Sequence, residues 1–124
     1  MGPRILTSPA EDVRGAGVPV EVVALDAPAR RAASYAERKV RRALATERRP
    51  VLHARVTLAR AHDPAVVRPA RAQVTVDLNG RIVRARAAAR TLPEAIDTAA
   101  SRLRAQLVRL DGRRRRPRRA ATRP

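Results

Sequence analysis

The chain has 124 residues and a formal net charge of +17, with 28 Lys and Arg residues against 11 Asp and Glu, and all but one of the bases are Arg. This length fits one small domain, and the lack of Cys excludes disulfides, a thiol nucleophile and a cysteine metal site. Because so many positive side chains repel one another, the imbalance indicates a polyanionic partner. The forked guanidinium of Arg is suited to phosphate.

The charge is distributed unevenly along the chain. Residues 1–19 carry equal numbers of acids and bases among several Pro and Gly residues, and we predict a flexible leader there. Residues 20–110 carry 19 bases and 8 acids, so the predicted folded domain, residues 20–111, is itself basic. Residues 112–124 contain a run of Arg, which predicts a disordered Arg-rich tail.

The first half of the domain predicts a strand followed by a helix. Residues 20–25 (VEVVAL) form a short and mostly apolar run, as in a strand, and Asp26 with Pro28 is typical of a helix start. From there to about Ala45, apolar residues recur in steps of three and four, which predicts one helix with a single buried stripe. That stripe contains Ala29, Ala33, Ala36, Val40, Ala43 and Leu44.

The second half predicts three strands and a second helix. Apolar and polar residues alternate over 52–58, 70–78 and 83–87, and Asn79-Gly80 between the last two runs predicts a tight hairpin. Thr91 and Glu94 form a capping-box pattern for a helix that we expect to end at Gly112. The order β-α-β-β-β-α predicts a two-layer α+β sandwich, in which a four-stranded mixed sheet carries two helices on one face.

Helical geometry brings several bases together. Arg31, Arg38 and Arg42 point away from the first apolar stripe, with Lys39 on its flank, and Arg102 and Arg109 share a face of the second helix. Few acids compensate them, so we predict a nucleic-acid surface, although a merely solvated charged face remains open. The candidate RNA-binding residues are Arg31, Arg38, Lys39, Arg42, Arg102, Arg104, Arg109, Arg113, Arg114, Arg115 and Arg116.

Catalytic chemistry has little support in the sequence. The chain has only two histidines, His53 and His62, and no Cys, and this set of residues makes a poor metal site. No glycine-rich phosphate loop is present. We therefore expect no enzyme activity, metal, cofactor or small-molecule substrate. The single aromatic residue, Tyr35, cannot supply the stacking platform of a single-strand binder. With no apolar run long enough for a membrane span and no secretory signal, we expect a cytoplasmic protein.

Two stretches resemble the ribosome hibernation-promoting factors, also called the ribosome-associated inhibitor or sigma-54 modulation family. They are residues 35–42 (YAERKVRR) and residues 94–107, and the resemblance covers about residues 20–110. It implies the same β-α-β-β-β-α fold. It also implies that the chain binds the small ribosomal subunit in the channel for messenger and transfer RNA and stops translation in stress or stationary phase.

The resemblance also implies roles for particular residues. Lys39 and Arg42, and Arg102 and Arg109, fall where the family carries bases on its two helices, and Asp97 and Gln106 match positions that we expect to be supportive. Ala105 and Pro93 depart from the pattern, and Arg104 or the Arg tail would compensate for a missing base. Long members carry a second, dimerising domain, so the chain resembles a short form or an N-terminal part.

Two alternative functions remain open at this point. Related α-β-β-β-α domains recognise duplex RNA by its shape, which permits a general double-stranded RNA or DNA binder. A basic module could instead bind an acidic protein. The oligomeric state is also open, because the edge strands of the predicted sheet have no assigned cover.

Overall fold

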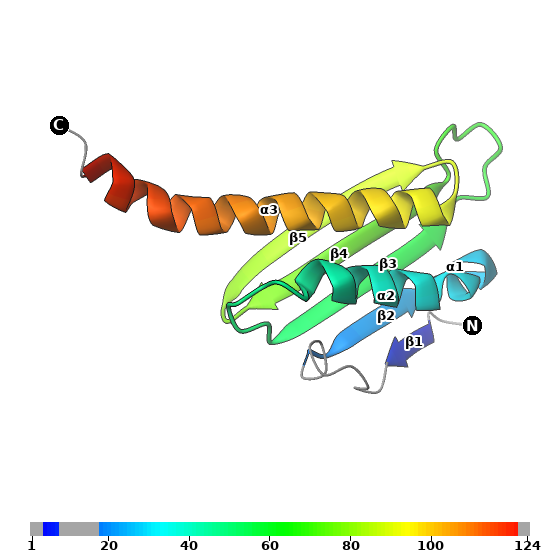
Figure 1. Cartoon of the computed structure of the whole chain (residues 1–124). Helices are drawn as coiled ribbons and strands as arrows, with labels where there is room; N and C mark the ends of the chain where they lie inside the picture. Colours follow the sequence, from blue (N-terminus) through cyan, green and yellow to red (C-terminus); the bar gives the residue numbers. More distant parts are fainter. Residues whose placement is uncertain (1–3, 8–17, 122–124) are drawn as a thin grey trace.

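The computed structural model describes residues 4–7 and 18–121, and the side chains of residues 18–111. A mixed sheet forms one layer and the helices form the other (Figure 1). The elements in chain order are β1 (Arg4–Thr7), β2 (Val20–Ala24), α1 (Ala27–Arg31), α2 (Ala33–Leu44), β3 (His53–Arg60), β4 (Ala70–Leu78), β5 (Arg81–Ala89) and α3 (Leu92–Ala121).

The sheet has the predicted topology and one additional strand. Its spatial order is β1-β2-β3-β4-β5, with β2 and β3 parallel and all other neighbours antiparallel. The parallel pair is joined by α1 and α2, as a βαβ crossover requires. The α+β class, the four predicted strands and the helices on one face are therefore confirmed.

The fifth strand corrects the prediction for the leader. Within residues 1–19, which we expected to be flexible throughout, Arg4–Thr7 pairs with β2 from Thr7 opposite Glu21 to Arg4 opposite Ala24. Residues 8–17 of that leader lie outside the described part of the chain. The short run Ile5-Leu6-Thr7 has strand-forming side chains, and pairing satisfies the edge of β2 that would otherwise be open.

The first predicted helix is divided into α1 and α2 at Ala32. Asp26 caps α1 as predicted, because its Oδ1 accepts a hydrogen bond from the Ala29 N–H at 2.8 Å. The N–H of Ala32 bonds to the carbonyl of Ala29, only three residues back, at 3.1 Å. This tighter turn interrupts the α-helical pattern for one residue before α2 begins at Ala33.

The last helix begins as predicted but continues further. The Thr91 side chain accepts a hydrogen bond from the Glu94 N–H at 3.3 Å and donates one to the Glu94 carboxylate at 2.9 Å. The predicted end at Gly112 is wrong, since α3 runs to Ala121 and extends beyond the sheet (Figure 1). Disorder of residues 112–124 is likewise corrected up to Ala121. A helical Gly costs only about 1 kcal/mol relative to Ala, so Gly112 alone does not have to end the helix.

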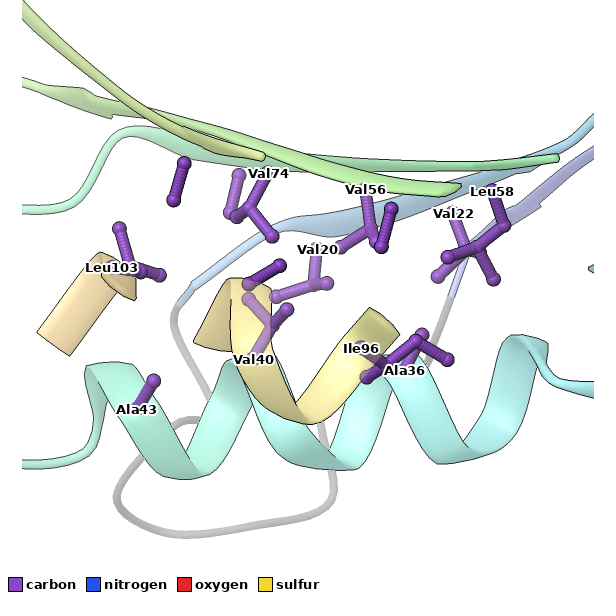
Figure 2. Packing of buried hydrophobic residues seen from close by; sticks show 14 of the residues in the cluster. Val20, Val22, Ala36, Val40, Ala43, Val56, Leu58, Val74, Ile96 and Leu103 are labelled. Atoms are coloured by element: carbon purple, nitrogen blue, oxygen red, sulfur yellow. The ribbon is translucent and has the colours of Figure 1, made fainter. Parts of the chain in front are cut away.

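The core lies between the sheet and the helices and is aliphatic. Figure 2 shows Val56, Leu58 and Val74 of the sheet directed toward Val40 of α2 and Ile96 of α3. The apolar stripe predicted for the first helix is buried, and among residues 18–111 no polar or charged residue is buried. The Asn79-Gly80 turn is confirmed by φ angles of 52° and 96°, values that favour Asn and Gly. This core fixes which sides of α2 and α3 face outward.

Candidate nucleic-acid interface

The outward side of the helical layer carries exposed arginines from three helices. Arg31 ends α1, Arg38 and Arg42 lie on α2, and Arg104 and Arg109 lie on α3; all five are exposed. None of the ion pairs found among residues 18–111 involves any of them. We call four of them, Arg31, Arg38, Arg42 and Arg104, the helical face; Arg109 points about 140° away from Arg104 on α3 and lies on the flank of Arg102. Their charges are available to an anionic partner.

Lys39 differs from these arginines because an acid on α3 pairs with it. Its Nζ lies 3.3 Å from Oδ1 of Asp97, and the Tyr35 hydroxyl donates a hydrogen bond to the same oxygen at 2.5 Å. The Lys39 Nζ and the Arg38 guanidinium carbon also lie 5.6 and 6.0 Å from the centre of the Tyr35 ring. The cluster joins α2 to α3, and Lys39 contributes less net charge to the surface than the sequence predicted.

This cluster makes the titration of Tyr35 informative. The hydrogen bond to Asp97 raises the pKa of Tyr35 above its ordinary value, because it stabilises the neutral phenol and the carboxylate repels the phenolate; Lys39 opposes the shift. Asp97→Asn is therefore expected to lower the Tyr35 pKa. Tyr35 is the only aromatic residue, so the ultraviolet absorbance of tyrosinate reports it directly. Asp63→Asn, in a distant loop, is the control, and an unchanged pKa in Asp97→Asn would contradict the contact.

Arg104, rather than Arg102, faces the groove between the two helices. A groove of about 300 Å³ lies beside the C-terminal end of α2, and Arg48, Arg49 and Arg104 line it together with Glu47 and Asp111. Arg49 forms an ion pair with Glu47 and donates a hydrogen bond to the Leu107 carbonyl at 3.0 Å. The sequence missed Arg48 and Arg49 because they follow the end of α2, where a helical projection gives no direction.

Arg102 lies on the opposite flank of α3, over β5. Its Nη1 donates a hydrogen bond to the Arg86 carbonyl at 2.6 Å, and Gln106 Nε2 donates one to the Arg84 carbonyl at 2.5 Å. Arg102 and Arg104 are two residues apart on a helix and therefore point about 160° apart. The structure thus brings Arg38, Arg42 and Arg104 to the outer side. It places Arg102 at the edge of the sheet, with Arg109 two turns further along the same flank of α3.

The remaining predicted residues, Arg113, Arg114, Arg115 and Arg116, lie in the last turns of α3, and their side chains are outside the described part. Within the described residues, no group of three or more His, Cys, Asp or Glu is placed to hold a metal ion. Over the same part of the chain, no helix has both the length and the hydropathy needed to cross a membrane.

Two comparisons with known proteins place the chain in a family. The family model described as "Sigma 54 modulation protein / S30EA ribosomal protein" matches residues 28–115. The N-terminal domain of Protein Y from Thermus thermophilus is a similar solved structure, with 34% sequence identity and a TM-score of 0.51 over 62% of this chain and 79% of that one. No curated protein matches the sequence. The family match spans most of the folded domain, including every residue of the helical face, and the chain therefore belongs to the sigma 54 modulation protein / S30EA ribosomal protein family.

Proposed function

We propose that the chain is a ribosome hibernation factor that binds the small ribosomal subunit through the helical face. The observation that carries this proposal is a face of exposed arginines that form no ion pair among the described residues, in a member of a ribosome-associated family. Arg suits phosphate because its planar guanidinium can form two parallel charge-assisted hydrogen bonds. The partner that fits this surface is the sugar–phosphate backbone of ribosomal RNA.

The proposed mechanism is occupancy without a chemical step. The domain fills the channel that messenger and transfer RNA use, and so it stops translation in the cytoplasm during stress or stationary phase. Contacts to phosphate fix the orientation of the domain, and base readout is unnecessary because the site is one fixed RNA shape. The aliphatic sheet beneath serves to hold α2 and α3 at a constant separation.

Binding to isolated subunits tests this function. Sedimentation of the purified chain with small subunits, large subunits and free RNA duplex should show preferential binding to the small subunit. Translation in vitro should fall as the chain approaches the ribosome concentration. With six to ten phosphate contacts, affinity should fall about 10³- to 10⁵-fold between 50 and 200 mM salt.

Two results would contradict this function and identify an alternative. Comparable affinity for duplex and for small subunits would indicate a general double-stranded nucleic-acid binder. Failure to bind any nucleic acid at moderate salt would indicate a module that binds an acidic protein instead.

A further inference from the structure

The face of the sheet that the helices leave uncovered carries a second group of arginines. Arg71 of β4 and Arg84 and Arg86 of β5 are exposed and lie on this face, opposite to the buried positions of the same strands. Gln73 pairs with Arg86 and Thr75 with Arg84, so Arg71 is the diagonal neighbour of Arg86. Three like charges therefore stand together on two adjacent strands, and we call them the sheet patch.

The acids on this face of the described sheet bond to groups outside the sheet patch. Glu21 is on the same face, but its Oε1 lies 2.7 Å from Arg55 Nε and 3.6 Å from His53 Nε2. Asp77 accepts a hydrogen bond from the Gly80 N–H at 2.8 Å, at the hairpin turn. Among residues 18–111, no ion pair involves a member of the patch. The patch therefore concentrates positive charge on one face of the sheet, which favours an anionic partner.

The sheet patch borders a groove that Arg102 completes. The groove has a volume of about 530 Å³ and is lined by Arg71, Arg86 and Arg102, with Thr57 and Gln73 as neutral hydrogen-bonding groups. Its apolar lining consists mainly of small side chains, together with the half-exposed Leu25. Arg102 reaches it from α3 because its guanidinium is held over the edge of β5 by the Arg86 carbonyl. This contact gives Arg102 a role at the sheet that the helical projection did not suggest.

We propose that the sheet patch and its groove bind the sugar–phosphate backbone of a second RNA segment, on the side of the domain opposite to the helical face. Basic and polar lining is typical of protein–nucleic acid interfaces. An acidic protein is the weaker fit, because the groove offers no Trp or Tyr anchor of the kind that dominates protein–protein binding. The domain is then held between two RNA segments, and two weak contacts combine into one strong attachment.

The test compares charge-matched variants on isolated small subunits and on free RNA. The sheet variant is Arg71→Gln, Arg84→Gln and Arg86→Gln, and the helical variant is Arg38→Gln, Arg42→Gln and Arg104→Gln. The control, Arg68→Gln, Arg81→Gln and Arg90→Gln, removes the same charge from exposed positions outside both surfaces. Because the sheet variant only removes like charges from one exposed face, its thermal midpoint should not fall, and measuring that midpoint separates a loss of binding from misfolding.

The sheet variant is expected to raise the Kd for small subunits by at least about tenfold, and to reduce the slope of log K against log salt by about 2–3. The control should change both values much less. A residual affinity of the helical variant for free RNA that disappears when the sheet substitutions are added supports the second surface.

Two outcomes would overturn this inference. One is a sheet variant with the affinity and salt slope of the unaltered chain. The other is a sheet variant that loses binding to poly-glutamate but not to RNA, which would assign the patch to an acidic protein. Either result leaves the helical face untouched, whereas failure of the proposed function appears as failure of the unaltered chain to bind small subunits.

Discussion

The helical variant, with Arg38, Arg42 and Arg104 replaced by Gln, is expected to bind the small ribosomal subunit at least about a hundredfold more weakly than the unaltered chain. These arginines are exposed and make no ion pair among the described residues, so their charges are free for phosphate. Charge-assisted hydrogen bonds are each worth about 1.5–3 kcal/mol. The loss of three such bonds is therefore enough to lower the affinity about a hundredfold, even after screening by solvent. Sedimentation or anisotropy at fixed salt measures the effect.

The design of this variant separates charge from stability. Gln has nearly the helix propensity of Arg, so α2 and α3 should remain intact and the circular dichroism should not change. The control set Arg68, Arg81 and Arg90 removes the same net charge from exposed positions and should weaken binding only slightly. An equal loss in both variants would show that total charge alone governs binding and that the helical face is no site.

Lys39 provides a sharper comparison within the same surface. Its ammonium group already interacts with Asp97, so part of its attraction to phosphate is cancelled in the free domain. The structure therefore ranks Arg42, which is exposed and outside the described ion pairs, above Lys39 in its contribution to RNA binding. The sequence ranked them equally, because it could not show the distance between α2 and an acid 58 residues away on α3.

The elements that the sequence predicted well are those governed by local rules. The alternation over residues 70–78 gave β4 with its observed bounds, because one buried face imposes a period of two. The same holds for the Asn79-Gly80 turn, where positive φ angles select these residue types. Asp26 and Thr91 were recognised as caps because their hydrogen bonds reach only three residues along the chain.

The features that the sequence did not predict depend on contacts between distant segments. Strand β1 has four residues and no alternation long enough to detect, and it is defined by its pairing with β2. Arg102 was predicted to share a face of the second helix with Arg109, but only the packing of α3 on the sheet shows that this side of α3 meets β5. The sheet patch likewise needed the register of β4 and β5, which sets Arg71 and Arg86 side by side.

Leu103→Ala is expected to destabilise the domain by about 2–5 kcal/mol, the usual range for deletion of a buried Leu side chain. Leu103 is fully buried on α3, beneath the sheet residues that Figure 2 shows directed toward the helices. With no Phe or Trp in the chain, neighbouring Val and Ala side chains are too small to fill the space that it leaves. Urea denaturation followed by far-ultraviolet circular dichroism measures the change.

Val108→Ala is the matched control, because Val108 lies on the same helix with 69% of its surface exposed and should cost less than about 0.5 kcal/mol. A small domain has a total stability of about 5–15 kcal/mol, so Leu103→Ala removes a large part of it. If both substitutions cost equally little, α3 cannot pack on the sheet in the observed orientation.

Leu103→Ala and the helical variant should respond to small ribosomal subunits in opposite ways, which connects the fold to the proposed function. Leu103→Ala leaves every arginine of the helical face in place, so its folded fraction should bind normally and small subunits should restore its stability by mass action. That restoration amounts to about 2.7 kcal/mol when the free subunit concentration is a hundred times Kd. The helical variant should be as stable as the unaltered chain when alone and should gain little from added subunits. If small subunits stabilise Leu103→Ala and the helical variant equally, then binding does not depend on the arginines that α2 and α3 display.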